Sequence, residues 1–262
     1  MARRTAHARR PHPLRFRAGT RASAAAVNRG IEEARGDVIG FISDDDVYHP
    51  DLVSDVLLEL DAHPDAVGTY ADWSIIDPSG YVLEEHRLPE FDRDLMLKAQ
   101  WCLPGVGAFV RASVARQIGG RDLGFRWVSD FDFWLRATAH GPMIHIPRIR
   151  GYWRHHDNAA TNSGRRIAMA DERIRLAAKH LESAGFKEKG RRRVMAAAHL
   201  TAGAIIARND DAAAFHHFAA ASQLDREFLD HLPENMAAYP TLWPLEVQSV
   251  LDLQNIDQSS AR

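Results

Sequence analysis

The sequence predicts an α/β fold in which helices flank a sheet, followed by a C-terminal helical region. Short apolar, β-branched segments alternate with helical segments through the first part of the chain, an order typical of a sheet layer covered by helices. After about Arg165 the composition changes to Ala, Arg, Leu and His at helical spacing. These observations divide the chain into a basic segment (1–20), an α/β domain (21–164) and a helical region (165–262).

The bulk composition is that of a globular protein, with 262 residues, 45% hydrophobic and 26% charged. A formal net charge of −2 gives no overall field that would recruit nucleic acid, so we expect no nucleic-acid partner. The single cysteine, Cys102, excludes an internal disulfide and suits a reducing compartment. No apolar run approaches the roughly 20 residues needed to cross a bilayer. We therefore expect a cytoplasmic protein.

Residues 1–20, "MARRTAHARRPHPLRFRAGT", are rich in arginine and contain no acidic residue. Such a segment can be a basic arm that contacts phosphates or anionic lipid, an arginine-rich targeting segment, or a solvated terminus without fixed structure. We expect the last of these. A peripheral contact with the inner face of the membrane stays open as an alternative.

The next elements lead into an acidic loop. An alanine-rich helix is predicted over Ser23–Arg35, ended by Gly36, and "DVIGFI" (37–42) predicts a short buried strand. Three consecutive aspartates, 44–46, follow at the carboxyl end of that strand, where α/β sheets place their ligands. Adjacent carboxylates repel one another, so the pattern favours a positive partner. A hard divalent cation, Mn²⁺ or Mg²⁺, completed by substrate phosphates fits this pattern, and a solvated acidic loop is the alternative.

The later elements continue the strand and helix alternation, and the strand–helix–strand order predicts a parallel sheet. In chain order the pattern predicts a helix from Pro50 to about His63, a strand over 66–77, a turn at Asp77–Gly80, a return strand over 81–85, a loop, strand and short helix over 104–120, a helix capped by Ser129 and stopped at Gly141, and one or two strands over 143–156.

Three blocks of the sequence carry a family resemblance. The first is "AVNRGIEEARGDVIGFISDDDVYHPDL", the second "GAFVRASVARQIGG" followed by "SDFDFWLRATAHG", and the third "YWRHHDNAAT". In this order, over about residues 22–162, they resemble the family 2 glycosyltransferases of the GT-A fold. The resemblance implies an incomplete GT-A (Rossmann-like) mixed sheet with flanking helices, and an inverting transfer that uses Mn²⁺ or Mg²⁺.

The resemblance also implies roles for individual residues. Asp45 matches the metal-binding acid, and its neighbour Asp44 matches an acid that touches the donor or the metal. Asp130 matches the general base, with Asp132 as the next candidate. The remaining implied positions are His156 for the metal or diphosphate, and Asn28 and Arg154 for the donor.

The implied reaction moves a sugar from a nucleotide-diphosphate donor to a hydroxyl of a sugar or lipid-linked acceptor, in the synthesis of polysaccharide, glycolipid or protein glycan. The leaving diphosphate develops negative charge that a cation stabilises, and the acceptor hydroxyl needs a positioned carboxylate to take its proton. Family members usually begin with strands that bind the nucleobase, and these would lie before residue 20, where the sequence has no room for them. The alternative is therefore a truncated or non-catalytic relative that serves as a binding or scaffold module.

Overall fold

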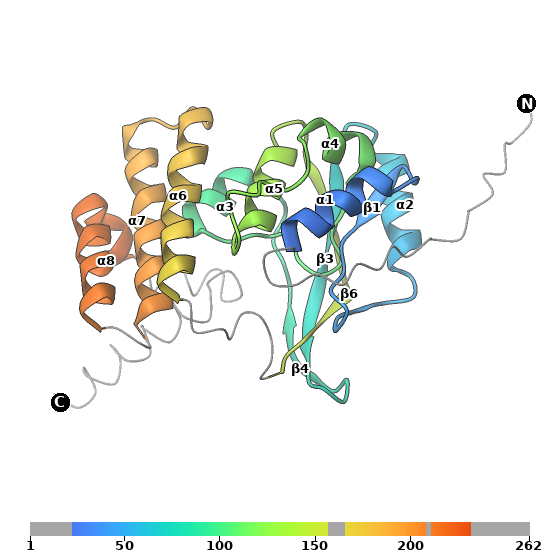
Figure 1. Ribbon diagram of the computed structural model, residues 1–262, viewed down its shortest axis with the longest axis horizontal. Helices are drawn as coiled ribbons and strands as arrows, with labels where there is room; N and C mark the ends of the chain where they lie inside the picture. The colour runs from blue at the N-terminus through green and yellow to red at the C-terminus, as the bar shows by residue number, and fades with distance from the viewer. Residues whose placement is uncertain (1–22, 157–165, 208–210, 232–262) are drawn as a thin grey trace, which may run out of the picture.

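The computed structural model describes residues 23–156, 166–207 and 211–231 of the chain (Figure 1). A six-stranded sheet lies beside a layer of long C-terminal helices. The expectations for residues 1–20 fall outside the described residues. Within the described part of the chain, no helix is long and apolar enough to span a membrane.

The sheet has the strand order β1-β5-β3-β6-β2, with β4 paired to β3. β3 and β6 are parallel, whereas every other pairing in the sheet is antiparallel. The expected mixed sheet is therefore confirmed, and the parallel sheet expected from strand–helix–strand order is wrong, because an apolar pattern does not encode strand direction. The strands are β1 Val38–Gly40, β2 Val47–Tyr48, β3 Gly68–Ile76, β4 Val82–His86, β5 Phe109–Arg111 and β6 Met143–Arg154.

Helices cover both faces of the sheet. The buried side of α2 (Leu52, Val56 and Leu60) packs with Ala71 of β3 and Ile146 of β6. Tyr70, the next residue along β3, points to the opposite face, as the alternation of strand side chains requires, and joins the core formed with α3 and α5. The helices of this part are α1 Ser23–Glu33, α2 Leu52–Ala62, α3 Arg93–Ala99, α4 Ala112–Gln117 and α5 Ser129–Ala137.

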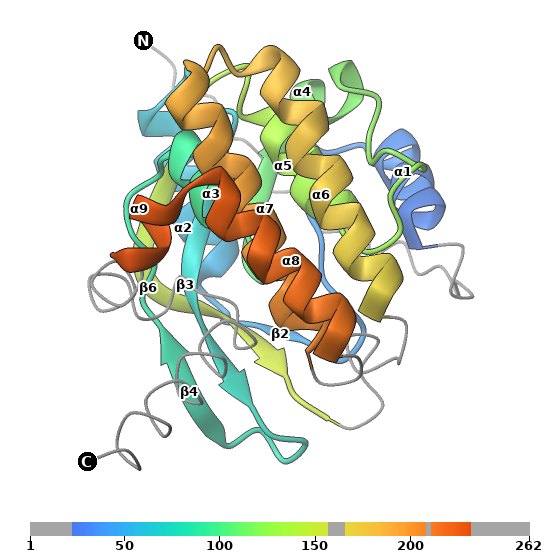
Figure 2. The same cartoon turned by 90° about the vertical axis from the view of Figure 1, so that its left-hand side faces the viewer.

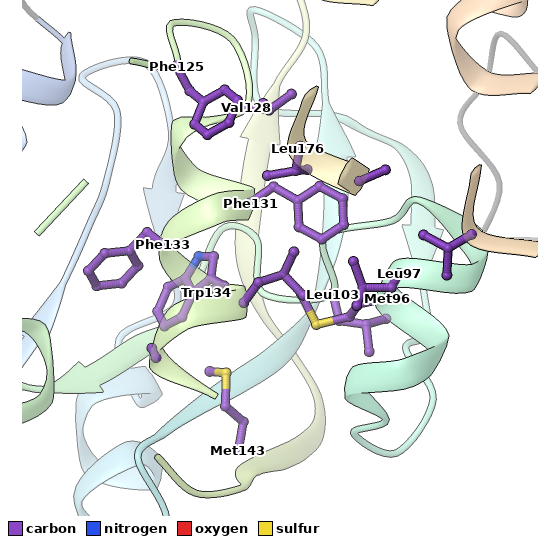
Figure 3. Close-up of a cluster of buried hydrophobic side chains, with 14 of the residues drawn as sticks. Met96, Leu97, Leu103, Phe125, Val128, Phe131, Phe133, Trp134, Met143 and Leu176 are labelled. Atoms are coloured by element: carbon purple, nitrogen blue, oxygen red, sulfur yellow. The ribbon is translucent and has the colours of Figure 1, made fainter. Parts of the chain in front are cut away.

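After β6, all regular elements in the described residues are helical, and Figure 2 shows three of them packed side by side. They share a hydrophobic core with the sheet domain: Leu176 of α6 lies beside Phe131 of α5, and Leu97 of α3 belongs to the same cluster (Figure 3). The helical region thus packs directly on the face that carries α5. Its helices are α6 Arg166–Ser183, α7 Glu188–Ile206, α8 Asp211–Leu224 and α9 Arg226–Asp230.

Two local features differ from the sequence-based expectations. Ser129 does not cap α5: it is the first residue of the helix, and Val128 holds the N-cap position without a side-chain cap. Helix α3, which the sequence reasoning did not assign, is capped by Asp92, whose carboxylate accepts a hydrogen bond from the backbone N–H of Leu95 (3.0 Å). A capping aspartate before an apolar run is a readable signal, so α3 could have been found.

Candidate active site

The acid loop between β1 and β2 lies against the end of β6. Nε2 of His156 is 2.9 Å from Oδ2 of Asp45, although the two residues are 111 positions apart in the chain. Their side chains remain 28% and 34% exposed, so a ligand from solvent can reach both. Asp44 is exposed on the same loop. The structure thus brings together Asp45 and His156, two of the three residues expected at a metal.

Arg154, two residues before His156, fixes the conformation of this loop. Its Nε donates to the backbone carbonyl of Asp45 (2.9 Å), and its backbone N–H donates to the carboxylate of Asp46 (3.0 Å). Its Nη1 donates to the carbonyls of Asp77 (2.8 Å) and Pro78 (3.0 Å) in the turn between β3 and β4. Arg154 therefore ties the acid loop to the sheet through backbone groups, and its cationic head lies within the site.

Asp46 belongs to the scaffold of the loop rather than to its open face. Burial raises the pKa of its carboxyl, opposed in part by the hydrogen bond from Arg154 and reinforced by the charge of Asp45. The hydroxyl of Tyr48 closes the loop from the other side by donating to the carbonyl of Phe41 (2.7 Å). These contacts hold the aspartates in one arrangement despite their mutual repulsion.

The distance between Asp45 and His156 can be compared with the spacing of ligands around a bound cation. Two ligand atoms on neighbouring positions of an octahedral Mg²⁺ or Mn²⁺ shell lie about 3 Å apart, because each is ~2.1 Å from the ion. The 2.9 Å between Asp45 and His156 matches that separation. Among the described residues, no group of three or more His, Cys, Asp or Glu side chains could enclose a metal. The residues present therefore fit an open site that takes its remaining ligands from phosphates and water, as Mg²⁺ sites with substrate phosphates do.

Asp130 lies in the first turn of α5 and is exposed. Its Oδ1 accepts a hydrogen bond from the backbone N–H of Phe131 (2.8 Å), which leaves the second carboxylate oxygen for another partner. Burial and the nearby charge of Asp130 both raise the pKa of the Cys102 thiol. Cys102 therefore stays protonated at neutral pH and is not an activated nucleophile, whereas Asp130 presents an accessible carboxylate.

Asp132, the alternative base, is fully buried. Its carboxylate accepts hydrogen bonds from Lys179 (2.6 Å), Arg136 (2.7 Å) and His180 (3.0 Å). Burial alone would raise its pKa, but these hydrogen bonds outweigh burial and lower it. A buried carboxylate with three donors cannot reach an acceptor hydroxyl, so Asp132 serves the structure of α5.

Asn28, expected at the donor, uses both ends of its amide on the backbone of Arg121. Its Nδ2 donates to the carbonyl (2.8 Å), and its Oδ1 accepts from the N–H (2.6 Å). The neighbouring Gly120 has φ +71° and faces this amide so closely that a Cβ there would overlap with it. In the structure Asn28 joins α1 to the segment after α4.

The sequence reasoning missed Glu172 of α6. Its carboxylate accepts hydrogen bonds from the backbone of the segment that leads into α5. No motif points to it, because the contact joins residues about 45 positions apart in regions with unrelated patterns.

Comparisons with known proteins show what this chain is similar to. Residues 4–119 match the model of the family "Glycosyl transferase family 2", and the match therefore includes α1, the acid loop and most of the arginine-rich segment. These residues are therefore similar to a family 2 glycosyltransferase domain. The proposed base on α5 and the histidine after β6 lie beyond the matched residues.

Two curated relatives are similar over 165 residues, or 62% of this chain. The uncharacterized protein y4gI of Sinorhizobium fredii is 32% identical, and the O-antigen biosynthesis protein RfbC of Myxococcus xanthus is 26% identical. The similar regions are 18% and 13% of those proteins, so the chain spans less than a fifth of the curated relatives it matches. The crystal structure of S. aureus TarS 1–349 superposes with a TM-score of 0.50 at 10% identity, covering 81% of this chain and 71% of that one. This likeness confirms the expected GT-A-like α/β fold.

Proposed function

We propose that the protein is a metal-dependent, inverting glycosyltransferase that moves a sugar from a nucleotide-diphosphate donor to a hydroxyl of a sugar or lipid-linked acceptor. The observation that carries this proposal is the contact between Asp45 and His156 beside the exposed Asp44. Two potential ligands from distant parts of the chain converge on the acid loop, which supports a metal site there. A solvated acidic loop would not require an arginine at the end of β6 and a histidine just after it.

The donor diphosphate would bind over the acid loop. Asp45 and His156, with Asp44 beside them, would hold Mn²⁺ or Mg²⁺, and the ion would supply Lewis-acid stabilisation of the charge that develops on the leaving diphosphate. Arg154 keeps the loop in the conformation that presents these side chains, and it adds positive charge near the diphosphate. In this account Asn28 contributes indirectly, through the segment that it anchors at Arg121.

The free oxygen of Asp130 would take the proton from the acceptor hydroxyl as that hydroxyl attacks the anomeric carbon. A positioned carboxylate of this kind contributes roughly 10²- to 10⁴-fold in rate. Attack from the face opposite the leaving diphosphate inverts the anomeric centre. The accessibility of Asp130, in contrast to the buried Asp132, supports its assignment as the base.

The likeness to an O-antigen biosynthesis protein supports a role in the synthesis of a cell-envelope polysaccharide. The single cysteine fits a reducing compartment, so we place the reaction in the cytoplasm. A lipid-linked acceptor would bring the protein into peripheral contact with the inner face of the membrane.

Titration calorimetry with Mn²⁺ and UDP tests the metal site directly. We expect binding by the full chain, strongest when both ligands are present, because the phosphates complete the shell. Asp45→Ala should abolish this binding and His156→Ala should weaken it at least tenfold. The matched control, Asp61→Ala, removes an exposed carboxylate from α2 and should bind within twofold of the parent. Unchanged binding in Asp45→Ala would end the assignment.

A further inference from the structure

Glu172 lies in α6 and is only 8% exposed, yet it contacts the polypeptide that leads into α5. Its Oε2 accepts hydrogen bonds from the backbone N–H groups of Trp127 (2.6 Å), Arg126 (3.0 Å) and Val128 (3.3 Å), and its Oε1 accepts a second one from Arg126 (2.9 Å). Three consecutive N–H groups directed at one anion form a backbone nest. Here the anion is supplied by a helix from another region of the chain.

This contact fixes the segment that precedes α5, a helix without a side-chain cap of its own. Val128 at the N-cap position has no side chain that can accept a hydrogen bond. Without Glu172, three N–H groups in a partly buried segment would lose their protein acceptor. Hydrogen bonds to a charged acceptor are about twice as strong as those between neutral groups. Glu172 therefore fixes the backbone of the residues that immediately precede Ser129 and Asp130.

The same helix holds α5 at further points. Lys179 and His180 of α6 donate to the buried carboxylate of Asp132. Between these contacts and Glu172, Leu176 packs against Phe131, as Figure 3 shows. Helix α6 thus fixes both the entry and the first turn of α5, so that the helix carrying Asp130 cannot shift independently of the helical region.

We propose that Glu172 is a positioning residue for Asp130, which makes α6 a structural part of the active site rather than an appendage to it. This inference rests on the proposed function, because Asp130 is the base only if the chain catalyses transfer. Glu172 touches no reacting group itself. It acts through the backbone of residues 126–128, and a misplacement of about 1 Å at a reacting group can cost roughly 100-fold in rate.

The test compares Glu172→Ala, Glu172→Gln and the control Glu182→Gln in the full chain. Glu182 is an exposed acid on the same helix, so its replacement changes the same charge without touching α5. Glu172→Gln keeps one acceptor oxygen and serves as the rescuing variant if Glu172→Ala does not fold. Amide hydrogen exchange is the first measurement. Exchange at residues 126–128 and at Phe131, whose N–H binds the Asp130 carboxylate, should rise at least tenfold in Glu172→Ala and less in Glu172→Gln.

The second measurement separates binding from turnover. Glu172→Ala should lower kcat about 100-fold, Glu172→Gln should lower it less than tenfold, and both should bind Mn²⁺ and UDP within twofold of the parent. Unchanged exchange at 126–131 would overturn the inference whether or not the chain has activity. Raised exchange with full turnover would also overturn it. If the parent catalyses no transfer, the proposed function fails, while the exchange data still decide whether Glu172 fixes the entry to α5.

Discussion

The acid loop and helix α5 carry the two proposed halves of the chemistry, and different parts of the chain hold them. The loop is fixed by two residues of its own sheet domain, Arg154 and His156, which lie at or just after the end of β6. Helix α5 is fixed by two residues of α6. Glu172 binds the backbone that leads into α5, and Lys179 binds the carboxylate of Asp132 in the first turn of α5. The metal half is thus anchored within the α/β domain, and the base half is anchored by the helical region.

Because of this difference, changes in the two regions should have different effects. A change near the acid loop should affect cation and nucleotide binding and leave α5 in place. A change in α6 should affect turnover and stability while cation binding persists. The acid loop also lies inside the residues that match the family model, whereas α5 and α6 lie beyond them. The acid loop can therefore be recognised from the family match, whereas α5, which the helical region supports, cannot.

The largest effect expected within this comparison follows from Asp130→Asn. Loss of a positioned base should lower kcat by roughly 10²- to 10⁴-fold. Asn can still accept the hydrogen bond from Phe131, so the fold and the binding of Mn²⁺ with UDP should stay unchanged. Steady-state kinetics together with calorimetry measure both quantities. A kcat within tenfold of the parent value would place the base elsewhere. It would also contradict the proposed division of the site between the acid loop, which holds the metal, and α5, which holds the base.

The next effect concerns the link between α5 and α6. Asp132→Asn removes the buried charge shared by Lys179 and Arg136. We expect a loss of about 3 kcal/mol in the free energy of unfolding. This is the lower end of the values for a broken buried ion pair, because both cations are partly exposed. The control is Asp94→Asn, which breaks the exposed Asp94–Lys98 pair and should cost less than about 1 kcal/mol. Urea denaturation measures both. Equal losses in the two variants would show that α6 does not hold α5 through this carboxylate.

The same carboxylate predicts a smaller, pH-dependent effect. The pKa of Asp132 is lower in the folded protein than the usual value near 4 of an unfolded chain. Its stabilising contribution is therefore fully present above about pH 4 and is lost as the pH falls toward the folded-state pKa. The stability difference between the parent and Asp132→Asn should be constant from pH 7 to pH 5 and should shrink below pH 4. A difference that grows on acidification would contradict the depressed pKa.

Much of the fold could be predicted because local patterns encode it. The apolar residues before the acid loop, the capping glycines and the alternation in β3 each act within a few residues. Strand direction could not be predicted, because the pairing of β1 with β5 and of β3 with β5 depends on contacts between distant segments. The cap of α5 was misassigned for the same reason. Ser129 has the right chemistry for a local cap, but it is the first residue of the helix, and the segment before it is held by Glu172 of a distant helix.

The site shows the same limit. The residues of the acid loop, Asp130 and His156 could be proposed from the sequence because they stand in a recognisable order along the chain. Their partners could not be read in this way: the sequence does not show that Asn28 holds Arg121, or that Arg154 binds three backbone carbonyls. Sequence order thus identified the groups that would do chemistry, and the structure identifies the groups that hold them.

The most direct test of the central claim is the anomeric configuration of the product. The full chain would be incubated with Mn²⁺, a panel of UDP- and GDP-linked hexoses and sugar acceptors, and the glycosidic product would be analysed by proton NMR. The account predicts a product whose anomeric configuration is opposite to that of the donor, because Asp130 directs a single displacement. A product with retained configuration would contradict the proposed mechanism. Donor binding without any product across the panel would instead support a non-catalytic relative.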